Sequence, residues 1–568
     1  MDSKIRQWLD KDPDAKSREE LQQLVDSANQ AELDRRFSGR LQFGTAGLRG
    51  VVGAGPAMMN ALVIRQTSAG LGQYILQELN NAAAKGVLVA YDGRLDSEQF
   101  AQETASVLAA LGITVYITPD VAATPIAGFC VLSLGCAAGV VVTASHNPPE
   151  YNGFKVYWEN GAQIIPPHDA GIAKEIERAA KGDVPWISFD DGVSSGKIVV
   201  LEREFYRRYI DAIQSSPLFS SNDGERSVSI AYTAMHGVGA SVAEALLAEA
   251  GFDSVYSVAS QREPDGNFPT VNFPNPEEPG AMDAVIALAG EHQATLACAN
   301  DPDADRLAVA VRTQNGDYQM LTGDMIGVLL ADYLLAMEHS FVPIVCTTIV
   351  SSSLLGKMAA VAGANFHETL TGFKWLANTA MQDEDEAGSR QFLFGYEEAL
   401  GYAPGRLVRD KDGLSALLAF AQMTDKLAQR GLTVMDQLEN IYRSYGIYLT
   451  AQRSIALQSG SASIGDTLRA TPPKSIAGIQ VDSTDDLSNG ARTFANGDSE
   501  SLNFPASDVL IYRLADNSRV VVRPSGTEPK VKCYYEVVEK LGEETYAEAM
   551  SHASERLSKL IDMHQKSL

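Results

Sequence analysis

A pattern of strands and helices that occurs three times limits the folds open to this chain. An apolar strand is expected at residues 86–91, 228–232 and 342–347, and a helical stretch follows each one. Strands that alternate with helices are typical of parallel α/β sheets. The sequence therefore predicts three similar α/β units.

Each unit contains a second apolar strand that leads into a polar loop. These loops cover residues 143–147, 300–305 and 395–398, and a short strand is expected after each of them. Ligands of α/β sheets bind outside the carboxyl ends of the strands. The three polar loops are therefore the first places to look for a functional site.

The remaining segments have a different character. Residues 1–40 are expected to form polar helices, and Ser and Asp are common over residues 454–508. Strands at 509–514 and 519–522 and a helix at 544–563 then predict an α+β domain. A length of 568 residues suits roughly three or four domains. We expect an α/β protein with domains at residues 1–210, 211–323, 324–446 and 447–568.

Composition narrows the classes of function. The chain carries 46 Lys and Arg against 72 Asp and Glu, a net charge of −26, which argues against a nucleic-acid-binding protein. No apolar stretch is long enough to span a membrane, and the charged first 14 residues do not resemble a secretory signal. The five cysteines form no C-x-x-C pair. Free thiols in a reducing cytoplasm are the expected state.

The loop from Asn300 to Arg306 contains three aspartates. Asp301, Asp303 and Asp305 alternate with Pro302 and Ala304. Converging carboxylates repel one another by about 4 kcal/mol at 4 Å and an effective dielectric of 20, so they call for a cation. Oxygen ligands suit Mg²⁺, Mn²⁺ or Ca²⁺. An EF-hand is a poor fit, because Arg306 and Arg312 occupy its glycine and closing glutamate positions. The alternative is a solvated acidic turn, against which the apolar strands on both sides of the loop argue.

The loop Thr143-Ala144-Ser145-His146-Asn147-Pro148 places a serine after a buried strand. It lacks the G-x-S-x-G elbow of α/β-hydrolases, and taken alone Ser145 reads as an ordinary turn serine. Lys155 follows on the next strand, on the face opposite Phe154 and Val156. It is therefore expected either to approach the serine loop or to be solvated.

Three further segments suit a phosphorylated ligand. Residues 523–530 combine hydroxyls, a glycine and basic side chains that suit a phosphate dianion without a Walker A motif, although a plain β-turn is the alternative. Residues 43–50 are rich in glycine and include Arg49. Residues 395–401 contain Glu397, which could accept hydrogen bonds from sugar hydroxyls if it is buried.

Together these motifs resemble the α-D-phosphohexomutase family of phosphoglucomutases and phosphomannomutases. T-A-S-H-N-P, D-P-D-A-D-R and R-P-S-G-T-E-P occur in that order, and the motifs span nearly the whole chain. The resemblance implies four domains around a central cleft. The N-terminal extension, F-G-T-A-G-L-R-G and G-Y-E-E-A-L-G-Y are most similar to the phosphoglucomutase branch, the one that also contains phosphopentomutase or bisphosphate-synthase relatives.

The resemblance also implies a role for each motif residue. Ser145 would carry the phosphoryl group and supply a ligand oxygen to Mg²⁺ beside Asp301, Asp303 and Asp305. His146 and Lys155 would assist proton transfer, and Arg49 and Arg306 would steady the transferring group. A base role for Lys155 near neutral pH needs a lowered pKa. The implied ligand-binding residues are Glu397, Ala399, Lys411, Arg523, Ser525, Gly526 and Thr527, and Lys530 lies beside them.

The implied reaction is a phosphosugar mutase cycle. It interconverts the 1-phosphate and the 6- or 5-phosphate of a hexose or pentose through a sugar bisphosphate, with glucose phosphates as the expected substrates. Ala399 stands where many phosphoglucomutases have a serine, so mannose, pentose and glucosamine phosphates remain open. The alternatives are a metal-dependent phosphatase that uses Ser145 and a non-catalytic sugar-phosphate-binding protein.

Overall fold

The computed structural model describes residues 3–219, 226–456, 464–524, 530–542 and 544–568. The chain divides into two compact units. The first comprises Met1–Leu321 and Ala399–Gln429, and the second comprises Thr322–Glu398 and Arg430–Leu568. Among the described residues, no helix has both the length and the apolar character to cross a membrane.

The first sheet has the strand order β1-β5-β4-β2-β3-β6. Its central strand β2 (Val87–Tyr91) is parallel to β3 (Val115–Ile117) and β4 (Ala138–Val142), and β5 (Tyr151–Trp158) is antiparallel to β4. Every residue of β2 and β4 is buried, as expected for parallel strands covered on both faces. The outer strands are β1 (Leu48–Val51) and β6 (Ile198–Val200).

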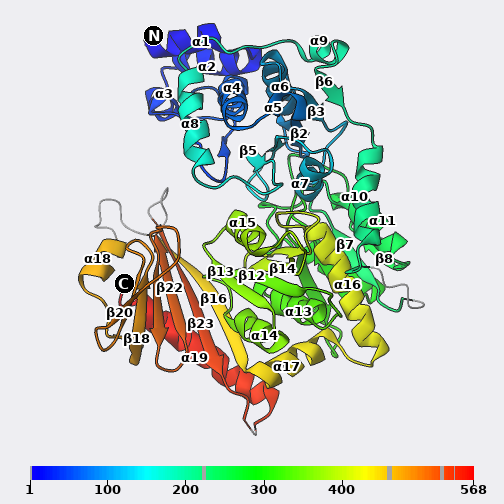
Figure 1. Ribbon diagram of the computed structural model, residues 1–568, viewed down its shortest axis with the longest axis vertical. Coiled ribbons are helices and arrows are strands. Elements are labelled where there is room, and N and C mark those ends of the chain that lie inside the picture. The colour runs from blue at the N-terminus through cyan, green and yellow to red at the C-terminus, as the bar shows by residue number, and fades with distance from the viewer. Residues whose placement is uncertain (1–2, 220–225, 457–463, 525–529, 543) are drawn as a thin grey trace. The chain divides into compact units, whose positions relative to one another are not determined.

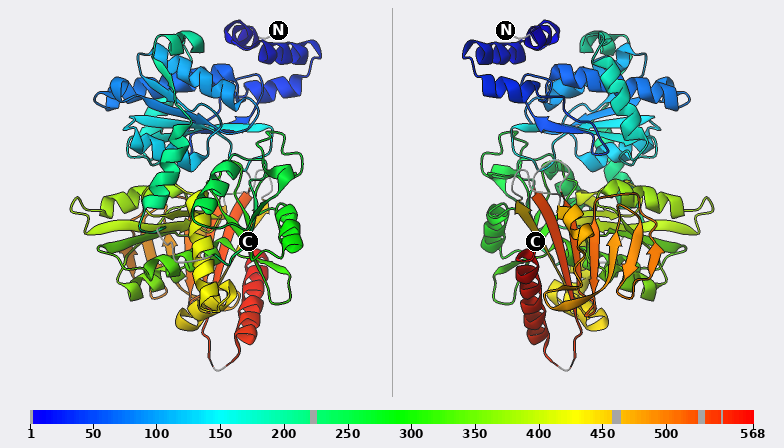
Figure 2. Two further views of the ribbon diagram at one scale, coloured as in Figure 1. Left: turned by 90° about the vertical axis from the view of Figure 1, so that its right-hand side faces the viewer. Right: turned by 90° about the vertical axis from the view of Figure 1, so that its left-hand side faces the viewer.

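Helices surround this sheet. They are α4 (Ala61–Glu78), α5 (Ala82–Lys85), α6 (Ser97–Ala110), α7 (Thr124–Ser133), α8 (His168–Ala179), α9 (Phe189–Ser194) and α10 (Glu204–Ser215). The predicted N-terminal helices are α1 (Ser3–Lys11), α2 (Ala15–Asp26) and α3 (Gln30–Phe37), dark blue in Figure 2. They join the core of this domain through Trp8, Leu21 and Leu33.

The second sheet repeats the same core order. It runs β11-β10-β9-β7-β8, with β7 (Ile230–Thr233) parallel to β8 (Val255–Ser257) and β9 (Leu296–Ala299). β10 (Ala308–Arg312) is antiparallel to β9 and to β11 (Tyr318–Met320). The helices here are α11 (Ala240–Glu249), η1 (Ala259–Gln261) and α12 (Asp283–His292), and α16 (Gly413–Gln429) packs on α11.

The third sheet has the strand order β13-β12-β14-β15, and its first three strands along the chain lie in the second unit. β12 (Val342–Thr348) is parallel to β13 (Asn365–Thr369) and β14 (Arg390–Glu397) and lies between them. The same arrangement relates β2 to β3 and β4 in the first sheet and β7 to β8 and β9 in the second. The predicted threefold repeat of α/β units is therefore confirmed. Its helices are α13 (Gly323–Leu335), α14 (Leu354–Ala362), α15 (Phe373–Asp383) and α17 (Val434–Tyr445), and β15 (Gly401–Pro404) follows β14 along the chain.

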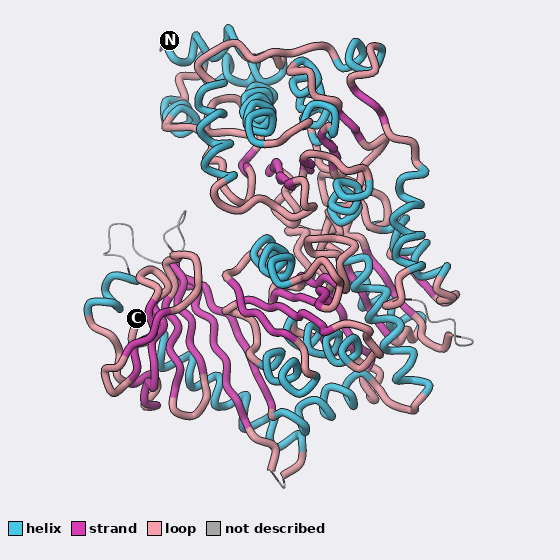
Figure 3. The backbone as a smooth tube through the Cα atoms, in the orientation of Figure 1, coloured by secondary structure: helices cyan, strands magenta, loops and turns pink. Residues whose placement is uncertain are grey.

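The last domain is an antiparallel sheet backed by a helix. Its strands lie side by side in Figure 3, and α19 (Tyr546–Gln565) packs along β16 (Ile447–Ala456) and β23 (Lys530–Glu539). Figure 1 shows that helix in red against the two strands. β22 (Arg519–Pro524) and β21 (Leu510–Leu514) confirm the two predicted strands. The remaining elements are α18 (Ile464–Ala470), β17 (Ser475–Ile476), β18 (Ile479–Asp486), β19 (Ala491–Phe494) and β20 (Ser499–Ser501).

Candidate active site

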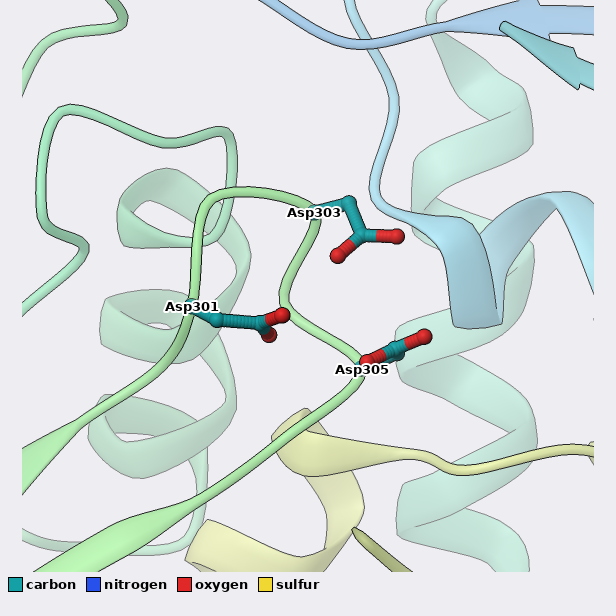
Figure 4. A group of neighbouring side chains, drawn as sticks. All are labelled: Asp301, Asp303 and Asp305. Carbon is teal, nitrogen blue, oxygen red and sulfur yellow. The ribbon is translucent and has the colours of Figure 1, made fainter. Parts of the chain in front are cut away.

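The aspartates of the loop between β9 and β10 are buried together. Asp301, Asp303 and Asp305 are at most 1% exposed, and one oxygen from each lies within 4.8 Å of the others (Figure 4). Oδ1 of Asp303 and Oδ1 of Asp305 have no hydrogen-bond partner among the described residues. Buried carboxylate oxygens without a donor are costly, so the donor set fits a divalent cation that binds oxygen ligands. The burial excludes a solvated acidic turn.

Backbone geometry turns this loop back on itself. The Ala304 amide donates to the Asp301 carbonyl at 2.8 Å, with Ala304 at φ +58°. The Asn300 side chain closes the loop by donating to the Arg306 carbonyl at 2.6 Å and accepting from the Tyr232 hydroxyl. These hydrogen bonds fix the backbone of the loop and so the positions from which the three aspartate side chains extend.

Two lysines face the aspartates. Lys155 Nζ lies 2.6 Å from Asp303 Oδ2 and 3.0 Å from Asp305 Oδ2, and Lys411 Nζ lies 3.0 Å from Asp305 Oδ2. Burial alone would lower the pKa of Lys155, but the two carboxylates outweigh it and raise that pKa. The surroundings of Lys155 therefore do not lower its pKa, as a base role near neutral pH would require. Of the two alternatives left open for Lys155, the structure shows approach to the site rather than solvation, since the residue is buried.

The aspartates themselves differ in pKa. Burial raises the pKa of Asp301 well above its ordinary value, and the charges of Asp303 and Asp305 raise it further. Burial acts in the same direction on Asp303, but Lys155 lowers the pKa of that carboxyl below its ordinary value. For Asp305, Lys155 and Lys411 together overcome burial and the Asp303 charge, so its pKa is also lowered.

Ser145 reaches the same site from the loop after β4. Its Oγ donates to Asp301 Oδ2 at 2.9 Å, and its side chain is 3% exposed. His146 Nδ1 lies 3.2 Å from that Oγ. Burial lowers the pKa of His146 well below its ordinary value, and Arg306 and Arg49 lower it further, so the imidazole is neutral near pH 7. The Ser145 hydroxyl thus lies within contact distance of both a neutral imidazole and a carboxylate of the buried triad.

Two arginines flank the serine loop and the triad. The Arg306 amide donates to Asp301 Oδ1 at 3.0 Å, and its guanidinium lies 3.9 Å from Asp301 Oδ2. Arg49, on β1, is exposed and donates to the Asn147 side chain at 3.0 Å. The structure thus brings Arg306 to the triad and Arg49 to the serine loop; the roles that the resemblance implies for them stay predictions.

Lys411 is held by residues that sequence reasoning missed. Its neighbour Asp410 accepts hydrogen bonds from Tyr157 and Gln163, both at 2.6 Å. Asp412 accepts from the Tyr209 hydroxyl with both carboxylate oxygens, at 2.8 Å. The sequence hinted at these contacts only through the position of Asp410 and Asp412 on either side of Lys411.

The remaining predicted residues belong to the second unit or its boundary. Glu397 Oε1 accepts from the Gly372 amide at 2.7 Å, and Glu398 Oε2 accepts from Ser351 Oγ at 3.0 Å. Burial raises the pKa of Tyr534, and Glu398 and Arg523 both act on that phenol electrostatically, which places Arg523 near the glutamate loop. Ala399 lies between β14 and β15, and Lys530 begins β23. Ser525, Gly526 and Thr527 lie outside the described residues.

Comparison with known proteins fits this arrangement. The descriptions of phosphoglucomutase/phosphomannomutase domains match in order along the chain: alpha/beta/alpha domain I at residues 40–183, domain II at 207–316, domain III at 322–445 and the C-terminal domain at 505–553. The chain belongs to the phosphoglucomutase/phosphomannomutase family. The predicted four-domain α/β fold is confirmed.

Relatives of full length support the assignment. A probable phosphoribomutase from Schizosaccharomyces pombe is 38% identical over 93% of this chain and 92% of its own. A glucose 1,6-bisphosphate synthase from Homo sapiens is 32% identical over 99% and 93%. The solved phosphoglucomutase parafusin from Paramecium shares the fold, with a TM-score of 0.66, 19% identity and coverage of 94% and 96%. The chain is thus an isomerase that transfers a phosphate within a sugar, as predicted.

Proposed function

We propose that this mutase moves a phosphoryl group between C1 and the terminal carbon of a sugar, with Ser145 as the carrier. One observation carries the proposal: Ser145 Oγ contacts Asp301 of the buried triad at 2.9 Å. Phosphoryl transfer depends mainly on positioning and on neutralising charge. A serine in contact with a metal-ligating carboxylate is placed for both.

Asp301, Asp303 and Asp305 are the proposed ligands of Mg²⁺, with an oxygen of the phosphorylated Ser145 beside them. The ion would supply positive charge that neutralises the transferring phosphoryl group. A phosphoserine carries about −1.5 to −2 charges at pH 7. Lys155, Lys411 and Arg306 add positive charge around the same point, and Arg49 is proposed to steady the group from β1.

The cycle follows from this placement. Phosphorylated Ser145 transfers its phosphate to the sugar monophosphate, and the resulting sugar bisphosphate turns and returns its other phosphate to Ser145. His146 is neutral and 3.2 Å from Oγ, so it can accept the hydroxyl proton during the return step. Lys155 stays protonated because Asp303 and Asp305 raise its pKa, so its proposed part in proton transfer is to donate a proton to the sugar oxygen that departs in the return step. A sugar bisphosphate of the glucose 1,6-bisphosphate type would restore the phosphoenzyme.

The sugar and its second phosphate are assigned to the remaining motif residues. Glu397 is proposed to bind sugar hydroxyls, and Arg523 to bind the phosphate that does not react. The same phosphate role is carried over to Ser525, Gly526, Thr527 and Lys530, and Lys411 is also proposed to contact the ligand. These roles rest on the family motifs at those positions.

For the substrate we favour pentose phosphates over the glucose phosphates expected from the motifs. Ala399 offers no hydroxyl at the position where many phosphoglucomutases have a serine, so one contact to a hexose hydroxyl is proposed to be missing. The relative from Schizosaccharomyces pombe, which spans 93% of this chain, is named a phosphoribomutase. Glucose 1-phosphate remains the second candidate because the phosphate and sugar motifs follow the phosphoglucomutase pattern.

The phosphoserine is tested by Ser145→Ala, with Ser133→Ala as the control because Ser133 is an exposed serine at the end of α7 in the same domain. We expect Ser145→Ala to lose turnover at least 10³-fold and to take up no phosphate from a labelled sugar bisphosphate. Ser133→Ala should match the wild type in both. Wild-type turnover by Ser145→Ala would falsify the mechanism.

The substrate is tested by a coupled assay of ribose, glucose, mannose and glucosamine 1-phosphates, with and without sugar bisphosphate. We expect the highest kcat/KM with ribose 1-phosphate and little release of inorganic phosphate. A higher kcat/KM with glucose 1-phosphate would select the second candidate. Phosphate release that matches substrate loss would indicate a phosphatase instead.

A further inference from the structure

Four backbone carbonyls of the Ser145 loop converge on one buried guanidinium. Arg94 Nη2 donates to the carbonyls of Ser145 and Asn147, both at 2.5 Å. Its Nη1 donates to the carbonyls of Pro148 and Tyr151 at 2.9 and 3.2 Å. Arg94 itself is 5% exposed, and it follows β2 rather than the strand that carries Ser145.

The loop that Arg94 holds has an unusual backbone. Ser145 is in the left-handed region at φ +52°, which residues other than glycine rarely adopt. Such a conformation persists only where surrounding contacts determine it. The Ser145 amide bonds to Thr143 Oγ1 at 2.8 Å, and its carbonyl is held by Arg94. Both ends of the nucleophile's backbone are therefore fixed.

Arg94 is in turn fixed from three sides. Asp92 Oδ2 lies 3.4 Å from its Nε, and the Phe268 ring lies 5.0 Å from its guanidinium carbon. Gly266, two residues before Phe268, packs closely on the turn that follows β2 and contains Arg94. The approach is so close that a Cβ on Gly266 would lie 2.6 Å from the Leu95 amide nitrogen. The turn is thus packed between the serine loop and a loop of the second domain. A guanidinium suits this place because its planar fork can serve several acceptors at once.

We propose that Arg94 is a positioning residue of the mutase: it holds the Ser145 loop so that Oγ points at Asp301. The inference rests on the proposed role of Ser145. Arg94 touches neither the triad carboxylates nor Oγ, so it acts through the backbone of the loop. Without it, Ser145 relaxes from the left-handed conformation, and Oγ leaves its place beside the metal ligands.

The test replaces Arg94 by Met, Lys and Ala, with Arg65→Met as the matched control. Arg65 also pairs with a carboxylate, Glu103, and lies over an aromatic ring, Trp186, but it contacts no part of the serine loop. For Arg94→Met we expect kcat to fall about 10²-fold, the loss typical of a reacting group displaced by about 1 Å. KM for the sugar monophosphate should change less than threefold. The kcat of Arg94→Lys should lie between those of the wild type and Arg94→Met, because an ammonium group lacks the planar fork of donors that lets the guanidinium bond to four carbonyls.

Two readouts separate positioning from general stability. Amide hydrogen exchange over residues 144–152 should speed up in Arg94→Met and stay unchanged in Arg65→Met. About 50 mM guanidinium chloride should restore the kcat of Arg94→Ala at least tenfold, whereas ammonium chloride at equal ionic strength should not. Arg65→Met should retain wild-type kcat under all conditions.

The outcomes are distinguishable. Wild-type kcat in Arg94→Met, or losses that are equal in Arg65→Met, overturns the positioning role. If Arg94→Met does not fold, Arg94→Lys decides by the same exchange and kcat comparison. Retained turnover in Ser145→Ala instead refutes the proposed carrier. If Ser145→Ala is inactive while the Arg94 variants are fully active, the positioning role of Arg94 is refuted and the carrier role of Ser145 is not.

Discussion

Glu398 offers a quantitative test of the electrostatics in the second unit. Its Oε2 accepts from Ser351 Oγ at 3.0 Å and from Thr348 Oγ1 at 3.4 Å, and both donors are buried. Burial raises its pKa from the ordinary 4.5 to about 7, and the charge of Glu397 contributes. Glu398→Gln replaces this carboxyl by a neutral group of the same shape.

The rise of the Glu398 pKa from 4.5 to about 7 fixes the size and the sign of the effect. One unit corresponds to about 1.36 kcal/mol, so the ionised carboxylate costs the folded unit up to about 3 kcal/mol. A group whose folded pKa is raised binds its proton more tightly in the folded state. The wild type therefore loses stability as pH rises from about 4.5 to 7, and the loss is complete above 7. Glu398→Gln avoids that loss at every pH.

Melting midpoints from pH 4.5 to 8.5 measure the difference. For a unit of about 200 residues, 1 kcal/mol moves the midpoint by roughly 2–4 °C. We expect Glu398→Gln to melt with the wild type near pH 4.5 and up to about 6–12 °C higher at pH 8. Glu386→Gln is the control, since it removes the same charge from an exposed position in the same unit.

Two results would contradict this reasoning. One is a difference between Glu398→Gln and wild type that does not change with pH. The other is a variant that melts below the wild type at pH 8, because the carboxylate would then stabilise the fold. Equal behaviour of Glu386→Gln and Glu398→Gln would assign the effect to net charge alone.

Three further predictions follow from the geometry. Thorough chelation should abolish turnover and Mg²⁺ should restore it, because the triad oxygens lie within 4.8 Å of one another; undiminished activity after chelation would sink the metal assignment. Tyr209→Phe should lower the stability of the first unit by about 1–3 kcal/mol in chemical denaturation, since it strips a buried donor from Asp412; no change would show that the bond is dispensable. Gly323→Ala should reduce the melting midpoint, because its Cβ would lie 1.8 Å from the Glu398 carbonyl oxygen, whereas Gly182→Ala, with nothing within 4 Å, should not.

Local sequence patterns determined most of the fold. Apolar strands followed by helices are short-range signals, so the three repeated sheets were predictable from the sequence. The strands between residues 475 and 501 were not predicted, because Ser, Thr and Asp are common in them, at buried as well as exposed positions, and such a composition resembles a loop. In β18, for example, Val481, Ser483 and Asp485 face inward although only the first is apolar.

The site was predictable where its chemistry lies in one loop. Asp301, Asp303 and Asp305 occur within five residues. Ser145 taken alone resembles an ordinary turn serine, and only the resemblance of its whole loop to the family motif singled it out. Arg94 was missed because the carbonyls it holds lie more than 50 residues away and carry no side-chain signature. The sequence also could not predict that the pKa of Lys155 is raised, because the carboxylate that raises it, Asp303, lies 148 residues further along the chain.

The chain passes between the two compact units three times, after Leu321, Glu398 and Gln429. Lys411 and its supporting aspartates therefore return to the first unit only after a long excursion through the second. No single continuous stretch of the gene encodes the unit that holds Ser145, the aspartate triad and Lys411. Recombination that exchanges the segment before residue 322 transfers the serine and the triad but leaves behind the lysine that faces Asp305. Although the three α/β sheets repeat one another, the first unit needs both residues 1–321 and residues 399–429, so exchange of one segment alone separates Lys411 from the aspartates that it faces.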